Sequence, residues 1–431
     1  MDIQLSRRVQ RIKPSPTLAV TARAAELKAA GHDIIGLGAG EPDFDTPEHI
    51  KAAAIAAIQS GQTKYTAVDG IPALKEAIQA KFKRENGLEY KLKQILVSVG
   101  AKHSLYNVMA AVLESGDEII VPAPYWVSYT DMAMLCDATP VIIKAGQEQN
   151  FKITPEQLEA AITPRSKLFI LNSPSNPTGV AYTREELQAL GEVLERHPQI
   201  LIVSDDIYEH ILWTPEPFVN IVNACPQLQD RTVVVNGVSK AYAMTGWRIG
   251  YAAGPAALTK ALTLLASQTT TCASAMSQAD AMTGWRIGYA AGPQHVIAAM
   301  SKIQGQCTSN PNTIAQIAAT AALNGDQSVI QPMLKAFKER HDFVVSRLNR
   351  MRGVRCLEAQ GTFYAFPHVE EAIRNLGLKD DVEFAEYLIK AGVALVPGSA
   401  FGLDGYARIS YATSMENLEK AMDRMEQALA G

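Results

Sequence analysis

The stretch VSKAYAMTGWRIGYAAGP at Val238–Pro255 carries the strongest structural signal in this chain, because its last thirteen residues return unchanged at Ala281–Pro293. Lys240 precedes only the first copy, and the matching position before the second copy, 38 residues later, holds Gln278. A lysine amine can form an imine with a carbonyl group, whereas a glutamine side chain cannot. Imine chemistry is therefore possible at the first copy alone. The Gly-rich run that begins at Arg248 predicts a strand behind a turn.

The repeat consists of one structural unit that is present twice. An offset of 38 residues aligns Ala243–Asp280 with Ala281–Ala318, and both tails predict a helix followed by a loop. No third copy exists, which excludes a solenoid. We expect the first copy to lie in a sheet and one unit to be surplus, either Ala256–Pro293 or Ala281–Ala318. Exclusion of the second copy would expose Trp285, Ile287 and Tyr289. If the second copy filled the sheet instead, Gln278 would stand where the lysine belongs.

Composition and charge exclude several classes of protein. Of the 431 residues, 47% are hydrophobic and 19% are charged, which is typical of a globular protein. The net charge of −4 argues against nucleic acid as the main partner, and the short basic run Arg7–Lys13 indicates a solvated face or helix end. No apolar stretch is long enough to cross a membrane, and no export signal is visible. Five scattered cysteines lack metal-type spacing, so we expect free thiols, no metal and a cytoplasmic protein.

Short apolar runs alternate with amphipathic helical runs, a pattern that predicts an α/β fold with a largely parallel sheet. From about residue 325 a long charged helix (Met333–Arg350) precedes short strands near Gly361–Phe366 and Ala407–Tyr411, which indicates a smaller α+β domain. We expect residues 1–48 to form an arm and part of the small domain, 49–325 the large domain with the repeat, and 326–431 the small C-terminal domain. The predicted buried strands of the large domain are Ile95–Val99, Glu118–Val121, Leu168–Leu171, Leu201–Ser204 and Thr232–Val235.

Polar residues follow these strands, at the end of a parallel sheet where ligands bind. Asp205 comes directly after a strand, and a carboxylate buried there needs a partner, such as a protonated ring nitrogen. Tyr208 follows three residues later and could bond a phenolic oxygen of the same ring. A helix N-cap is the alternative role for Asp205. Asn176 lies between two prolines that hold its backbone, although this segment could be only a loop. Trp126 could stack on a flat ring or belong to the core.

An anion site is indicated by a second set of residues. Gly100, Ala101 and Lys102 connect a strand to a helix, so their backbone amides could face a phosphate. A glycine at such a turn is common and does not establish the site. Arg248 offers a planar guanidinium that could bind phosphate through two hydrogen bonds.

Together these segments resemble the class I/II aminotransferases of pyridoxal-phosphate fold type I. The resemblance rests on NSPSNPTG (Asn172–Gly179), SDDIY (Ser204–Tyr208) and VSKAYAMTGWRIGY (Val238–Tyr251). GLGAGEPDFDTPEHI, TKYTAVDG, PYWVSY, VPGSAFG and ARISYATS are similar to the bacterial aspartate aminotransferases, including those that accept prephenate. The resemblance covers the whole chain apart from one repeat unit. It implies a large domain with a mostly parallel sheet flanked by helices, a smaller α+β domain, and pyridoxal 5'-phosphate as the cofactor.

The resemblance also implies a role for individual residues. Lys240 would form the Schiff base with the cofactor and shuttle the proton. Asp205 would pair with the pyridine nitrogen, and Asn176 and Tyr208 with the phenolic oxygen. Trp126 would stack on the ring. The residues that the family implies around the phosphate are Gly100, Ala101, Lys102, Ser239 and Arg248, together with Tyr65 from a second subunit. At the substrate, Arg408 and Gly40 would bind the α-carboxylate, and Lys13 or Lys102 would bind the distal carboxylate.

The sequence departs from the family in two further places. Gly237 stands three residues before Lys240, where the family often has a serine, so one hydroxyl at the phosphate would be missing. Asp206 replaces a glutamate in SDDIY without changing its neighbours.

The implied reaction is a ping-pong transamination between amino acids and 2-oxo acids, with aspartate and 2-oxoglutarate favoured, in a homodimer with shared active sites. The alternatives with the same cofactor are transamination of aromatic amino acids, prephenate or alanine, and carbon–sulfur lysis. A non-enzymatic alternative is a regulatory protein, or a folded protein that the repeat has made inactive.

Overall fold

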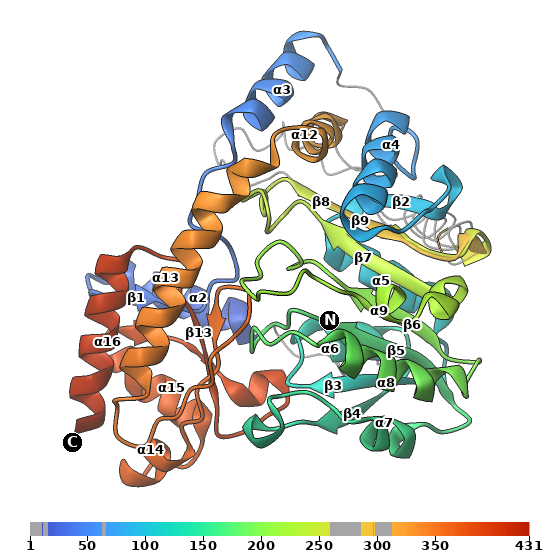
Figure 1. The fold of residues 1–431 in the computed structure, drawn as a ribbon. Helices are drawn as coiled ribbons and strands as arrows, with labels where there is room; N and C mark the ends of the chain where they lie inside the picture. Colours follow the sequence, from blue (N-terminus) through green and yellow to red (C-terminus); the bar gives the residue numbers. More distant parts are fainter. Residues whose placement is uncertain are drawn as a thin grey trace, which may run out of the picture.

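The computed structural model describes Arg11 and residues 16–62, 66–258, 286–295, 297 and 313–430. Its centre is a sheet with the strand order β2-β9-β8-β7-β6-β5-β3-β4 (Figure 1). The bounds of these strands are β2 Ile95–Val99, β3 Glu118–Ala123, β4 Thr139–Lys144, β5 Ser166–Asn172, β6 Leu201–Asp205, β7 Thr232–Gly237, β8 Arg248–Ala253 and β9 Arg286–Ala291.

Parallel pairing dominates this sheet. The strands β4, β3, β5, β6 and β7 run parallel to one another, whereas β8 pairs antiparallel with both β7 and β2. All five runs that the sequence predicts as buried strands form strands, and four of them extend one to three residues further than predicted. The predicted α/β fold with a mostly parallel sheet is therefore confirmed.

Helices bury both faces of the sheet, which explains why its strands are continuous apolar runs rather than alternating ones. On one face Leu96 and Val233 join a core with Leu105 and Met109 of α5. On the other face Val97 and Ile202 join a core with α3, α4, α8 and α12. The bounds of the elements around the sheet are α3 Glu48–Gln59, α4 Pro72–Lys81, the π-helix η1 Phe82–Asn86, α5 Ala101–Val112, α6 Ser128–Leu135, α7 Pro155–Ala161, α8 Arg184–Glu195, α9 Ile221–Ala224 and α12 Thr313–Asn324.

A second group of elements lies beside the large sheet (Figure 1). It contains two small sheets, β1 with β11 and β10-β13-β12. The long charged helix predicted at Met333–Arg350 is present, but it begins two residues earlier, with Pro332 in its first turn, and it ends two residues earlier, at Leu348. The bounds are α2 Pro16–Ala29, β1 Ile35–Gly36, α13 Gln331–Leu348, β10 Tyr364–Ala365, α14 Glu370–Asn375, α15 Asp381–Lys390, β11 Val393–Ala394, β12 Val396–Pro397, β13 Ala407–Ser410 and α16 Met415–Ala430.

Both copies of the repeated stretch are part of the sheet. β8 pairs Ala253 with Ile95, and β9 pairs Ala291 with the same Ile95. The structure differs from the expectation that only the first copy lies in the sheet, since both copies pair with the same residues of β2, to which strands of identical sequence are equally complementary. Gln278 and Trp285 lie outside the described residues.

The helix α12 shows which tail of the repeat belongs to the fold. It begins inside the second unit and buries Ile314, Ala315 and Ala318. The counterpart of Ala318 in the first unit is Asp280, a carboxylate that could not be buried there without a partner. Of the two segments expected to be surplus, Ala281–Ala318 is thus excluded.

Two further sequence expectations concern cysteines and membranes. Cys225 and Cys356 are free thiols, and Cys272 and Cys307 lie outside the described residues. Among the described helices, none combines the length and apolar character needed to cross a membrane.

Candidate active site

Three neighbouring strands of the large sheet place the polar residues of the candidate site. Asn172 is the last residue of β5 and pairs in register with Asp205, the last residue of β6. Lys240 follows three residues after the end of β7. Asn172 Nδ2 donates to the Asp205 carbonyl over 2.8 Å, and Asn172 Oδ1 accepts from the Asn176 amide over 2.9 Å. The loop that carries Asn176 is therefore tied to the strand that carries Asp205.

Asp205 is a buried carboxylate, 4% exposed. No helix begins at Asp205, so the N-cap alternative is wrong. The Tyr129 hydroxyl donates to Asp205 Oδ2 over 2.6 Å. Burial raises the pKa of Asp205 to about 6, although the Tyr129 hydrogen bond opposes this rise. A cationic partner would stabilise the ionised carboxylate. The neighbouring Asp206 instead accepts from Ser204 and Asn220.

Lys240 lies on the opposite side of the site, with its amine against aromatic rings and a carbonyl. Its Nζ donates to the Gly40 carbonyl and lies 5.8 Å from the centre of the Tyr208 ring and 5.6 Å from that of Phe363. Burial lowers the pKa of Lys240, the charges of Glu41 and Asp205 oppose this shift, and the Arg408 guanidinium adds to it, so that the pKa lies at about 8. About a tenth of this amine is thus uncharged at pH 7, far more than for an ordinary lysine, and a nucleophilic amine must be uncharged.

Arg408 brings the second group of elements to the site. It lies on β13 and is 2% exposed. Its Nη1 donates to Asn176 Oδ1 over 3.1 Å and its Nη2 donates to the Gly38 carbonyl over 2.6 Å. The guanidinium lies 4.5 Å from the centre of the Tyr364 ring. Its Nε is buried without a partner in the described part of the chain. The Phe401 ring lies 4.9 Å from the same guanidinium. A buried guanidinium whose described contacts are neutral oxygens and aromatic rings can bind a carboxylate.

A cradle for an anion lies where α5 meets β8. Gly100 precedes α5 with φ +84°, a conformation that favours glycine. A Cβ at this position would lie 2.6 Å from Arg248 Nη2, so the guanidinium packs against Gly100, the residue directly before the helix that begins with Ala101 and Lys102. The Arg248 Nε is buried and without a partner among the described residues. Ser239 is also buried, at the turn before Lys240.

At Gly237 the structure leaves no room for the serine that the family often has. A Cβ there would lie 2.8 Å from the Ile249 carbonyl oxygen.

Trp126 lies between Lys102 and Tyr129. The Lys102 Nζ is 5.2 Å from the Trp126 ring centre, and the Tyr129 ring meets it edge-on at 5.4 Å. Tyr208 is tied to Tyr364, because their hydroxyls are 3.0 Å apart. The described site therefore brings together all the predicted residues except Tyr65 and Lys13, which lie outside the described residues.

Sequence reasoning missed Tyr129, Tyr364 and Gly38. Tyr129 stands three residues after Trp126, so the one-turn spacing in PYWVSY was an available signal. Tyr364 and Gly38 had none, because their contacts depend on how the two groups of elements meet.

Replacement of Tyr129 by phenylalanine is expected to weaken pyridoxal-phosphate binding about tenfold at pH 7, because a hydrogen bond to a buried charged group contributes about 1.5–3 kcal/mol. Loss of this donor also moves the pKa of Asp205 further up, so the affinity should fall away at a higher pH than in the parent protein. Titration of the apoprotein with the cofactor between pH 5.5 and 8.5, about the span in which Asp205 ionises, measures both effects. Tyr90→Phe is the matched control, because the buried Tyr90 hydroxyl has no partner among the described residues. An unchanged affinity in Tyr129→Phe would contradict the role of this contact.

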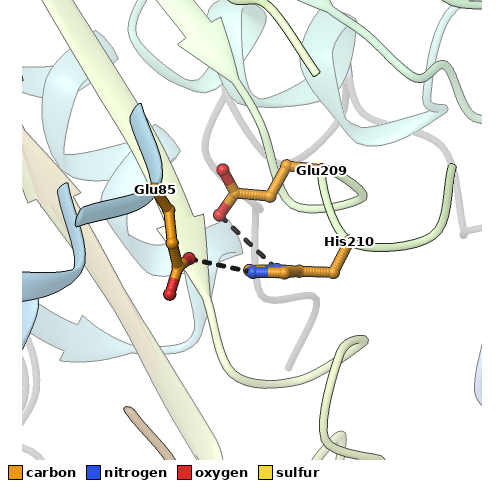
Figure 2. Close-up of side chains that lie close together, drawn as sticks. All are labelled: Glu85, Glu209 and His210. Carbon is orange, nitrogen blue, oxygen red and sulfur yellow. Dashed lines mark hydrogen bonds and ion pairs between the residues drawn. The ribbon is translucent and has the colours of Figure 1, made fainter. Parts of the chain in front are cut away.

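Outside this site, Glu85, Glu209 and His210 form a cluster with metal-type ligands (Figure 2). His210 Nε2 lies 3.0 Å from Glu85 Oε2, and its Nδ1 lies 3.6 Å from Glu209 Oε1. The fully buried ammonium of Lys81 contacts Glu209 and lies 3.5 Å from Glu85. Burial opposes ionisation of Glu85, but His210 and Lys81 outweigh it and lower its pKa to about 2. The positive charge that a metal would bring is thus already supplied by Lys81, and the cluster ties η1 to the segment after Asp205.

The site fits pyridoxal phosphate. Two buried guanidinium nitrogens, Arg248 Nε and Arg408 Nε, have no partner among the described residues, and the Arg248 guanidinium lies against Gly100 at the start of α5. The site also contains the partly buried Lys240 amine and the buried Asp205 carboxylate. The amine could react with the aldehyde of the cofactor, and the carboxylate could pair with its ring nitrogen.

Comparison with known proteins gives the same assignment. The family model for aminotransferase class I and II matches residues 32–282 and 272–425. The chain is 54% identical to the aspartate/prephenate aminotransferase of Nitrosomonas europaea, over 99% of this chain and 100% of that protein. It is 47% identical to an aspartate aminotransferase of Geobacillus stearothermophilus, over 99% and 98%.

Solved structures agree with these relatives. The aspartate aminotransferase of Rhizobium meliloti superposes with a TM-score of 0.88 at 44% identity, covering 100% of this chain and 99% of that one. That of Thermus thermophilus with maleate superposes with a TM-score of 0.86 at 39% identity, covering 99% and 100%. A chain that shares this fold and so many residues with these enzymes over its whole length belongs to the class I and II aminotransferases, which act with pyridoxal phosphate.

Proposed function

We propose that this protein transfers the amino group of L-aspartate to 2-oxoglutarate, giving oxaloacetate and L-glutamate by ping-pong chemistry at Lys240. One observation carries the proposal. The buried guanidinium of Arg408 and the amine of Lys240 belong to one site. Arg408 contacts Gly38 and Lys240 contacts Gly40 in the same short segment, and the Tyr364 ring beside Arg408 is bonded to Tyr208 beside Lys240.

The described contacts support the roles of the cofactor-binding residues. Arg248, Ser239 and the helix N-terminus at Gly100–Lys102 would hold the phosphate, with Tyr65 added from a second subunit. Asp205, held by Tyr129, would pair with the ring nitrogen, and Asn176 and Tyr208 would bond to the phenolic oxygen. Trp126 would stack on the ring. When bound, pyridoxal phosphate supplies an aldehyde for imine formation and a ring that accepts electrons from the substrate.

Lys240 and Arg408 act on the substrate. Arg408 binds its α-carboxylate with two parallel hydrogen bonds, assisted by the backbone of Gly40, and so orients the Cα–H bond. The substrate amine displaces the Lys240 amine. The free Lys240 Nζ then takes the α-proton from the substrate and delivers it to the cofactor. The pKa of about 8 suits both directions of this transfer, because the amine readily gains and loses a proton near neutral pH.

An acidic substrate is supported by the relatives, which are named for aspartate, and by the maleate bound in the Thermus thermophilus enzyme, since maleate is a dicarboxylate. Lys13 or Lys102 would bind the distal carboxylate. The position of the Lys102 ammonium over the Trp126 ring supports Lys102 in this role. Prephenate, also a dicarboxylate, is the second candidate, as an amino-group acceptor, because several relatives carry its name.

Initial rates with a panel of donors test the proposal. With 2-oxoglutarate as the acceptor, we expect kcat/KM for aspartate to exceed that for alanine, phenylalanine and cystathionine by at least about tenfold, because a second charge pair contributes about 1.4 kcal/mol or more. With aspartate as the donor, prephenate and 2-oxoglutarate are then compared as acceptors. Faster turnover of phenylalanine or alanine than of aspartate would replace the proposed substrate, and pyruvate release from cystathionine would replace the reaction.

We further propose a cytoplasmic homodimer. The exposed face of α3 supports an interface, because Ile55 is 52% and Ile58 is 39% exposed there. The proposed domains are the arm and part of the small domain at 1–48, the large domain at 49–325 and the small domain at 326–431. The two small sheets that lie apart from the large sheet support this division. We infer that the repeated stretch arose as a 38-residue duplication, which the overlap of the two family-model matches at 272–282 supports.

A further inference from the structure

The two copies of the repeat meet the same residues of β2. Leu96 pairs with Ala252 of β8 and with Ala290 of β9, and Val97 pairs with Tyr251 and with Tyr289. Neighbouring strands of a sheet lie about 4.8 Å apart, so two strands cannot share one position. At the ends of the two strands the copies overlap, because a Cβ atom added to Gly254 would collide with the backbone of Gly292.

The residues after the strands coincide in the same way. The amides of Gly254 and Gly292 both donate to the Gln94 carbonyl, over 2.9 Å and 3.3 Å. The Ile297 amide donates to the Pro293 carbonyl over 3.0 Å and to the Pro255 carbonyl over 3.3 Å. Pro255 can therefore replace Pro293 as the residue that leads into the tail of the second unit.

We propose that β8 and β9 are alternative occupants of one strand position beside β2, and that the folded protein exchanges between a β8 form and a β9 form. The proposal concerns the fold and does not depend on the proposed substrate. In each form the other copy is outside the sheet.

The two forms have closely similar free energies. The thirteen residues from Ala243 to Pro255 and their counterparts are identical, so each copy offers the same side chains to β2 and β7. The surplus segment between the points of attachment is 38 residues in both forms, and the entropy of closing a loop depends on its length. The two forms differ only in the place at which this segment leaves the sheet.

Lys240 belongs to both forms. The repeated unit begins at Ala243, and Lys240 is held from the other side, three residues after β7. In the proposed β9 form, Lys240 rather than Gln278 would therefore supply the lysine of the site. In that form Arg286 takes the register position of Arg248, with which it pairs in the structure.

The forms differ at the rim of the active site. In the β8 form the surplus joins the fold at Pro255 and Gln294, at the end of the strand beside Gln94. In the β9 form it joins at Tyr242 and Ala281. Residue 243 lies at the rim, because the Ala243 carbonyl accepts from Thr46 over 2.8 Å and Thr245 donates to Glu41. The β9 form is thus expected to turn over substrate more slowly.

Disulfide trapping tests the proposal without relying on activity. Opposed residues of antiparallel strands are close enough for a disulfide. Leu96→Cys is combined with Ala252→Cys in one variant and with Ala290→Cys in another, and the cross-linked peptides are quantified by mass spectrometry after mild oxidation of the holoenzyme. We expect both disulfides, with yields that agree within about tenfold. A ratio greater than tenfold in favour of either disulfide would overturn the exchange.

Strand-specific disruption supplies an independent test. Ile249 is fully buried, and an aspartate in its place cannot be accommodated in the sheet. We expect Ile249→Asp and the register-equivalent Ile287→Asp each to unfold cooperatively, because the intact copy fills the position, whereas the double variant has no cooperative transition. If one single variant behaved like the double variant while the other matched the parent, one copy alone would be the strand.

Discussion

Lys240→Ala will lower kcat by about 10⁴-fold or more and abolish the visible absorbance of the lysine-bound cofactor. Two functions are lost at once, because the alanine can neither bond to the cofactor nor carry the substrate α-proton, and loss of a general base alone costs about 10²–10⁴-fold. The cofactor should still bind, because Arg248, Asp205 and Asn176 remain in place. Absorbance spectra, single-turnover rates and cofactor content measure the three results.

Lys240→Arg is the matched control, because it keeps a cation and a long side chain but cannot form the bond. It should behave like the alanine variant in absorbance and turnover. Retention of absorbance and turnover by Lys240→Ala would refute the assignment of this lysine.

The parent protein should also capture the cofactor faster as pH rises through about 8, the pKa of Lys240. The direction follows from burial, which disfavours the charged amine in the folded state. In the unfolded chain the amine has its ordinary pKa near 10.5, so the unfolded state binds more protons between these values. The stability of the apoprotein relative to Lys240→Ala is therefore expected to rise between pH 8 and 10.5, as denaturant unfolding at several pH values would show.

Arg408→Ala will lower kcat/KM for aspartate by about 10³-fold or more, since a buried bidentate ion pair to the substrate is lost. Arg408→Lys should lower it about 10²-fold, because a single ammonium keeps the charge but not the fork of two donors. The absorbance of the bound cofactor should persist in both variants, because the contacts of Lys240 and Arg248 do not include Arg408 as a hydrogen-bond partner. Steady-state kinetics with aspartate and spectra of the purified proteins provide the measurement.

Arg374→Ala is the control for a general effect of charge removal. Arg374 is an exposed residue of α14 whose nearest carboxylate, on Glu370, is 3.9 Å away, and its removal should leave kcat/KM unchanged. Unchanged kinetics in Arg408→Ala would show that the substrate carboxylate binds elsewhere.

Local patterns in the amino-acid sequence are sufficient to predict several parts of this protein. Apolar runs such as Thr232–Val235 predicted strands correctly, because a strand buried on both faces leaves a continuous hydrophobic signature. Lys240, Asp205 and Asn176 were found because each follows such a strand at the end where ligands bind.

Only the tertiary structure decided the contacts between segments far apart in the chain. Tyr364 and Gly38 reach the site because β13 and the segment after β1 meet the large sheet there, and no spacing in the sequence records that meeting. The repeat shows the same division. The sequence revealed two identical strands, but the burial of α12 decided which tail is part of the fold. The shared register on β2 placed both copies at one position, because pairing depends on the partner strand as well as on the strand itself.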